Sequence, residues 1–257
     1  IGMGIPVHVF DDAVPTPMCA FAVLHLHAAA GVVVTASHNP ASDNGFKVYA
    51  ANGAQIIPPI DEEIARHMAM APSAMPHLDV AADVSGLRHA VTTSIDDAYV
   101  DGILRSAPQV ANSVAPLRIV YSAMHGVGHR WVVRVLRQAG YQHIHAVPSQ
   151  ADPDGAFPTV QFPNPEEAGA LDLAKGLASD VDADVILAND PDADRLAVAV
   201  PHPGGGFVQL SGNAVGVLLG SQAIEHSVHP LSQSLVLNSL VSSRQLGTYA
   251  KRRGALH

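Results

Sequence analysis

The stretch LRIVYSAM at residues 117–124, followed by HGVGHRWVVRVLRQAG at 125–140 and YQHIHAV at 141–147, indicates the fold class. The first and last segments are rich in β-branched residues, which predicts strands over Leu117–Met124 and Tyr141–Val147. The segment between them predicts a helix over Gly128–Ala139, with Gly140 at the position that favours a helix end. A strand, a helix and a second strand in succession predict an α/β architecture.

The same alternation continues toward the C-terminus. A helix is expected from Asn164-Pro165-Glu166-Glu167, which supplies an N-cap, a proline at N1 and acidic first-turn residues, to about Ala178. One face of that helix carries Leu171, Ala174, Leu177 and Ala178. Further expected elements are a strand over Asp184–Ala188, paired strands over Leu196–Val200 and Phe207–Leu210, a helix over Asn213–Glu225 and a strand over Ser234–Leu240.

Similar patterns precede the opening unit. Val32–Thr35 is a short β-branched run, which predicts a buried strand. The segments Phe46–Tyr49 and Ala54–Ile57 flank Asn52-Gly53, a strong hairpin signal. A helix is expected over Asp61–Met70, and residues 71–96 predict loops and short strands.

Bulk composition narrows the classes of function. The 257 residues are 48% hydrophobic, enough for a sizeable core, and the formal charge of −9 argues against nucleic acid or an anionic membrane as the main partner. With Cys19 as its single cysteine, the chain can form no intrachain disulfide, which fits a cytoplasmic location. The apolar stretch Ala20–Ala36 contains His25 and His27, so no membrane span is expected. The chain starts at Ile1 without a methionine, and residues Ile1–Phe10 resemble the interior of a domain. We therefore expect a fragment.

The sharpest local signal is the acidic loop Asp190-Pro191-Asp192-Ala193-Asp194-Arg195. Alternate side chains of an extended segment point the same way, so three carboxylates converge and favour a hard cation such as Mg²⁺, Ca²⁺ or Mn²⁺. An EF-hand would need Gly at its sixth position and Glu at its twelfth, where this chain has Arg195 and Pro201. A solvated acidic turn is the remaining alternative.

The second signal is Thr35-Ala36-Ser37-His38-Asn39-Pro40, which follows the Val32–Thr35 strand. A serine at a strand end, among polar residues and before a proline, is displayed to solvent, but it needs activation to act as a nucleophile. His38 and Lys47 are available nearby. Considered alone, the segment is better explained as a turn that Ser37 and Asn39 merely shape. Among the scattered histidines, His125 at the end of the Leu117–Met124 strand is the one of interest.

Together, the two loops resemble the α-D-phosphohexomutase family. Its phosphoserine signature T-A-S-H-N-P stands unbroken at Thr35–Pro40, with a typical continuation at Asp43–Tyr49, and its metal signature D-x-D-x-D-R stands at Asp190–Arg195. The segments Asn52–Ile56, Met124–Gly128, Phe157–Val160 and Phe162–Glu167 resemble the branch that contains bacterial phosphoglucomutases and the phosphopentomutase and glucose-1,6-bisphosphate synthase group. The resemblance covers nearly the whole chain.

The resemblance implies successive α/β domains with mixed sheets: most of domain one at residues 1–112, domain two at 113–212 and the start of domain three at 213–257. It also implies interconversion of glucose 1-phosphate and glucose 6-phosphate through phospho-Ser37 and glucose 1,6-bisphosphate. One Mg²⁺ would be held by Ser37, Asp190, Asp192 and Asp194. Arg195 would hold phosphate, and Lys47 is preferred to His38 as the proton carrier, with His38 as a phosphate or serine-loop contact.

Two sets of alternatives stay open. Phosphopentomutase or phosphomannomutase activity would use the same residues on another sugar phosphate, and a non-catalytic fragment that binds metal or phosphosugar is the second class. The family's G-T-[SA]-G-x-R start, its G-E-x-S-G-H-like sugar loop and its R-x-S-G-T-like phosphate clamp are not found in these 257 residues. We therefore expect slow turnover from this chain by itself. Oligomeric state is not indicated.

Overall fold

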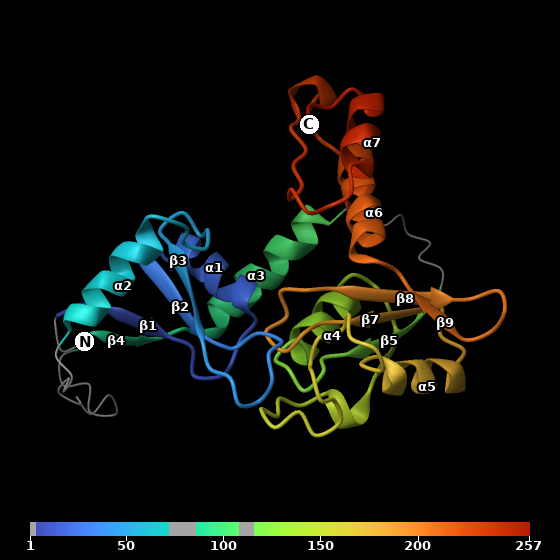
Figure 1. The fold of residues 1–257 in the computed structure, drawn as a ribbon, viewed down its shortest axis with the longest axis horizontal. Coiled ribbons are helices and arrows are strands. Elements are labelled where there is room, and N and C mark those ends of the chain that lie inside the picture. Colours follow the sequence, from blue (N-terminus) through green and yellow to red (C-terminus); the bar gives the residue numbers. More distant parts are fainter. Residues whose placement is uncertain (1–3, 72–85, 108–115) are drawn as a thin grey trace.

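A five-stranded mixed sheet is the largest sheet of the described chain, with strand order β6-β5-β7-β8-β9 (Figure 1). The computed structural model describes residues 4–71, 86–107 and 116–257. Strand β5 (Arg118–Ser122) runs parallel to β6 (His143–Ala146) and to β7 (Val185–Ala188). The loops that follow β5 and β7 therefore lie at the same edge of the sheet, which brings them next to each other.

The other side of the sheet is antiparallel. Strand β8 (Ala197–Pro201) pairs with β7, and β9 (Phe207–Gln209) pairs with β8. Helix α5 (Asp172–Asp180) packs on this sheet, with Ala174 and Ala178 fully buried. Their core cluster also contains Val120, Val147, Ala183, Ile186 and Ala199. The predicted strands and the apolar face of the helix are confirmed, as is the mixed α/β fold class.

The predicted start of the helix that contains α5 is wrong. Residues 164–170 form turns, in which Asn164 Oδ1 accepts from the Glu166 backbone N–H at 3.1 Å, and the helix begins only at Asp172. Gly169, with φ of 83°, interrupts the chain before that point. Asn164 therefore caps a turn and not a helix, because the left-handed Gly169 cannot continue an α-helix.

The N-terminal part contains two two-stranded sheets. Strand β1 (Val7–Val9) pairs in parallel with β4 (Arg88–Ala90), and β2 (Ala30–Val34) pairs antiparallel with β3 (Phe46–Ala50). Three helices accompany them: α1 (Thr16–His25), α2 (Ile60–Met70) and α3 (Thr93–Ser106). The α2 prediction is confirmed, whereas α1 and α3 were not expected from the sequence. Of the loops and short strands predicted over residues 71–96, the short strand β4 is confirmed, the last residues instead begin α3 at Thr93, and 72–85 lie outside the described residues.

One apolar cluster joins this part to the five-stranded sheet. Helix α4 (His129–Gln138), which follows β5, buries Trp131 against side chains of α1 and α3. The buried members are Met18, Ala22, Ile95, Val100 and Trp131. Because α1 also packs on β2 and β3, this cluster sets the position of the β2 end relative to the loop after β7.

The prediction of a strand at Val32–Thr35 is confirmed, but the prediction that this strand is buried is wrong. The strand exists, but Val32 is 60% and Val34 is 83% exposed. Their side of the strand faces a cavity of about 1170 Å³, which residues of β1 and β2 both line. Because no described residue fills that space, the apolar run lies on an open surface and not in a core.

Two further short strands were predicted wrongly. The Asn52-Gly53 turn forms, with Gly53 at φ of 74°, but residues 54–57 make a single bridge, between Gln55 and Tyr49. Helix α6 (Gly212–Glu225) is confirmed, whereas Ser234–Leu240 is reduced to one bridge from Leu235 to Leu256. That segment lies between a short 3₁₀ turn, η2 (Leu231–Gln233), and α7 (Gln245–Arg253), a helix not expected from the sequence.

The remaining feature is a 3₁₀ turn, η1 (Pro148–Gln150), directly after β6. Within the part of the chain that the structure describes, no helix is both long enough and apolar enough to cross a membrane.

Candidate active site

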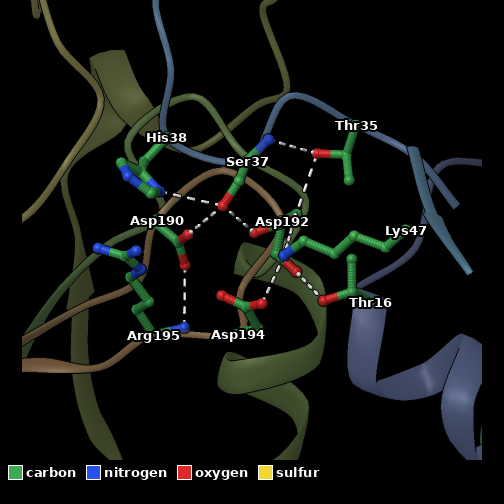
Figure 2. Close-up of polar contacts among 9 residues, drawn as sticks. All are labelled: Thr16, Thr35, Ser37, His38, Lys47, Asp190, Asp192, Asp194 and Arg195. Carbon is green, nitrogen blue, oxygen red and sulfur yellow. Dashed lines mark hydrogen bonds and ion pairs between the residues drawn. The ribbon is translucent and has the colours of Figure 1, made fainter. Parts of the chain in front are cut away.

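The Ser37 side chain lies at the end of β2 and points at the acidic loop that follows β7 (Figure 2). Its Oγ atom is 3.3 Å from Asp190 Oδ2, 3.4 Å from Asp192 Oδ1 and 3.1 Å from His38 Nδ1. Ser37 has φ of 57°, a left-handed conformation that is unusual for a non-glycine residue and recurs at functional sites. The predicted serine and two of the predicted aspartates are therefore neighbours, although they lie far apart in the sequence.

Thr35 fixes the conformation of the serine loop. Its hydroxyl accepts a hydrogen bond from the Ser37 backbone N–H at 2.8 Å and donates to Asp192 Oδ2 at 3.3 Å. The Thr35 backbone N–H donates to the Gly45 carbonyl at 3.0 Å. The loop is thus tied both to the strand that follows it and to the acidic loop opposite.

Three carboxylates converge in the acidic loop. One ligand oxygen from each of Asp190, Asp192 and Asp194 lies within 4.8 Å of the others, and the first two residues are 0% and 4% exposed. This trio is unique among the described residues as a group with metal-binding geometry. With the Ser37 oxygen beside them, the donor set is all oxygen and anionic, which fits a hard divalent cation such as Mg²⁺.

The electrostatics of Asp190 support that fit. Burial, and secondarily the charge of Asp192, raise the pKa of Asp190 to about 7. The Arg195 backbone N–H donates to Asp190 Oδ1 at 3.0 Å and opposes the rise. Crowded, buried carboxylates of this kind are costly to ionise without a compensating cation.

Lys47, on β3, supplies a positive charge at the rim of the trio. Its ammonium lies 2.8 Å from Asp192 Oδ2 and 2.5 Å from Asp194 Oδ2. Burial alone would lower the pKa of Lys47, but its hydrogen bonds to these two aspartates outweigh burial and raise it. The side chain therefore stays protonated at neutral pH.

His38 and Arg195 lie on the opposite side of the trio from Lys47 (Figure 2). Burial, and then the charge of Arg195, lower the pKa of His38. The imidazole is therefore neutral near pH 7 and is able to exchange a proton with the Ser37 hydroxyl, which it contacts.

Thr16 also contacts the site, although nothing in the sequence pointed to it. The first residue of α1, it is fully buried, and its backbone N–H donates to the Asp192 carbonyl at 3.0 Å. The Pro15-Thr16-Pro17 segment contains no chemical motif, so only the three-dimensional contact identifies its part in holding the acidic loop.

These features define a class: an α/β protein that presents a displayed serine to a carboxylate cluster suited to a divalent cation. Models of phosphoglucomutase/phosphomannomutase domain I and of phosphoglucomutase/phosphomannomutase domain II match residues 1–74 and 97–205, respectively. The chain belongs to the phosphoglucomutase/phosphomannomutase family.

Individual relatives agree with this assignment. A Haemophilus influenzae protein named "Probable phosphomannomutase" is 42% identical over 98% of this chain and 51% of its own length. Human phosphopentomutase is 40% identical over 99% of this chain and 43% of its own length. The crystal structure of a phosphomannomutase-type protein from Thermus thermophilus matches with a TM-score of 0.80 at 25% identity, over 99% of this chain and 54% of that one. The chain thus spans about half the length of these relatives.

Proposed function

We propose that the protein is a Mg²⁺-dependent phosphosugar mutase that moves a phosphoryl group between the 1- and 6-positions of glucose phosphate through phospho-Ser37. The observation that carries the proposal is the approach of Ser37 Oγ to Asp190 and Asp192, at 3.3 and 3.4 Å, from two segments that are remote in sequence. In this family such a serine and such a trio belong to one active site.

The chemistry follows from the positions of the side chains. In the first transfer, the bond from phosphorus to Ser37 Oγ breaks as a bond to a sugar hydroxyl oxygen forms, and the hydroxyl proton passes to a protein group. The resulting sugar bisphosphate turns around, and the second transfer runs in reverse onto Ser37. A bound Mg²⁺ would neutralise charge on the transferring phosphoryl group, held by Ser37, Asp190, Asp192 and Asp194.

The protein groups orient the reactants and handle protons. Lys47 is protonated and adjoins the trio, which suits it as the proton carrier: it gives its proton to Ser37 Oγ as that oxygen departs and is restored by the proton that the sugar hydroxyl releases. On the return transfer the same exchange runs in reverse. His38 contacts the Ser37 oxygen directly and orients it. Arg195 lies beside Asp190, and its planar guanidinium suits it to hold a phosphate of the substrate.

The substrate class and the setting are parts of the same proposal. Glucose phosphate is favoured on branch resemblance, and pentose phosphate is the main alternative because phosphopentomutases are among the relatives. The glucose 1,6-bisphosphate intermediate would also serve as the activator that first phosphorylates Ser37. We further propose a cytoplasmic location, and a domain division at residues 112 and 212 stays a prediction.

The half-reaction tests this function on the chain itself. Incubation with glucose 1,6-bisphosphate and Mg²⁺ should place one phosphoryl group on Ser37, detected by peptide mass spectrometry, and Ser37→Ala should remove it. A comparison of glucose 1-phosphate with ribose 1-phosphate in a coupled assay then ranks the sugars. Metal binding without any phosphorylation of Ser37 would instead support the non-catalytic alternative.

A further inference from the structure

The turn that follows β5, residues 124–128, has an unusual backbone that the proposed chemistry does not use. Met124 and His125 have φ of 49° and 60°, so two consecutive non-glycine residues are left-handed, and both are buried. Each such residue costs on the order of 1 kcal/mol or more. A conformation of this kind persists only where surrounding contacts hold it.

The turn packs backbone to backbone on the acidic loop. A Cβ atom built on Gly126 would lie 2.3 Å from both the Cα and the carbonyl oxygen of Pro191, far inside contact distance. The next residue, Val127, donates its backbone N–H to the Pro191 carbonyl at 2.8 Å. Pro191 stands between Asp190 and Asp192, so the turn touches the residue that sets the spacing of these two carboxylates.

A chain of hydrogen bonds holds the turn from behind. Ser122 accepts from the Met124 N–H at 3.1 Å and donates to Gln150 Oε1 at 2.7 Å. The Gln150 amide then donates to the Thr159 hydroxyl at 2.9 Å, which lies 2.7 Å from His125 Nε2. The backbone N–H of His125 donates to the backbone carbonyl of Gln150 at 3.1 Å.

These hydrogen bonds run in one consistent direction when the Thr159 hydroxyl donates to a neutral His125 ring. Burial lowers the pKa of His125, which agrees with a neutral ring. The hydroxyls of Ser122 and Thr159 and the amide of Gln150 then each donate one bond and accept another, from the core out to Thr159 at the surface. The turn is therefore locked at both of its left-handed residues.

We propose that Gly126 is a positioning residue for the divalent-cation site: its lack of a side chain lets the locked turn press on Pro191 and set the separation of Asp190 and Asp192. The inference rests on the proposed metal site. It predicts that cation affinity depends on a residue that offers no ligand atom, because a displaced Pro191 would move both carboxylates. Outer contacts of this kind typically change metal affinity by about 10- to 100-fold.

Mn²⁺ binding to the whole chain, measured by electron paramagnetic resonance well below the unfolding temperature, tests the proposal. Gly126 does not have a positive φ, so Gly126→Ala adds steric conflict with Pro191 and no backbone strain. We expect its Kd for Mn²⁺ to rise about tenfold. The matched control is Gly176→Ala in α5, where a Cβ meets nothing within 4 Å, and its Kd should be unchanged.

A second pair of variants tests the lock without touching the contact. Thr159→Val removes the hydroxyl that bonds His125 and should raise the Kd about threefold or more, whereas Thr159→Ser keeps it and should stay near wild type. This pair decides the matter if Gly126→Ala does not fold. The proposal is overturned if folded Gly126→Ala, or Thr159→Val, binds Mn²⁺ with the wild-type Kd and differs only in a lower unfolding temperature. The turn would then have a structural role alone.

Asp192→Asn separates this inference from the proposed metal site. Loss of Mn²⁺ binding in Asp192→Asn together with unchanged binding in Gly126→Ala would overturn only the positioning role. Unchanged binding in Asp192→Asn would remove the acidic trio as the metal site, and the positioning role with it.

Discussion

At the scale of single residues, the ionisation of Asp190 links the acidic loop to the stability of the fold. Its pKa in the folded protein is about 7, against an ordinary value of 3.8, so between these pH values the folded protein holds a proton that the unfolded chain releases. The stability from this group is complete below about pH 4 and is lost as pH rises toward 7.

Metal-free protein should therefore lose thermal stability across this window, and Asp190→Asn should lose less. Asparagine keeps the carbonyl oxygen that accepts the Arg195 N–H but cannot ionise. Differential scanning calorimetry in EDTA from about pH 4 to 7 compares the two proteins. Parallel curves for wild type and variant would show that Asp190 ionises in the folded state as it does in the unfolded one.

Lys47 competes with a bound cation for the same carboxylates. Its ammonium contacts Asp192 and Asp194, so a divalent ion at the trio meets a positive charge already there. Lys47→Met should bind Mn²⁺ about two- to tenfold more tightly, on the order of 1 kcal/mol. If Lys47 carries the proton in the phosphoryl transfer, the turnover of Lys47→Met should fall about 100-fold or more. Looser Mn²⁺ binding in the variant would contradict the competition.

The residues that the sequence could supply are those with distinctive chemistry. Ser37 and the acidic trio stand in motifs whose spacing indicates their use. Thr16 and Gly126 act through a backbone N–H and through a missing side chain, respectively, and neither property distinguishes them in the sequence. Their contacts with Asp192 and Pro191 depend on how distant elements pack, which local patterns do not encode.

At the scale of elements, local patterns predicted most of the five-stranded sheet and failed where an element depends on its neighbours. Strands β5, β7 and β8 are apolar runs that the sheet buries, so pattern and burial agree. The Ser234–Leu240 segment also contains the apolar run Leu235–Leu237, but it has one bridging partner among the described residues and forms no strand. Helix α1, by contrast, was not predicted, because it is apolar on nearly all sides and so lacks the alternation of polar and apolar residues that indicates a helix.

The exposed side of β2 leads to a prediction about surface properties. Val32 and Val34 face the cavity of about 1170 Å³, and exposed apolar surface in a concave site binds hydrophobic dyes. The chain should enhance the fluorescence of anilinonaphthalene sulfonate, and Val32→Thr with Val34→Thr should reduce that signal without lowering the unfolding temperature. Val228→Thr, at a residue 90% exposed in another unit, is the control and should change the signal little. An unaltered signal in the double variant would place the dye elsewhere.

At the scale of the whole molecule, the site is divided between two packed units. Ser37 lies in the loop after β2 and Lys47 lies on β3, whereas the aspartates come from the loop after β7. The α1-α3-α4 cluster around Trp131 holds the units together on one side, and the contacts of Ser37, Lys47 and Thr16 with the acidic loop do so on the other.

A cation bound by ligands from both units should therefore stabilise the whole chain. Mg²⁺ at about 100 times its Kd adds about 2.7 kcal/mol to the free energy of unfolding. We expect Mg²⁺ to raise the unfolding temperature of the wild type, and Ser37→Ala, which removes the one ligand from the β2 side, to reduce that rise at equal Mg²⁺ concentration. The unfolding temperatures without Mg²⁺ serve as the baseline for each protein. Because a cation held by the aspartates alone would stabilise both proteins equally, an undiminished rise in Ser37→Ala would place the ion within one unit and remove the metal link between serine and trio.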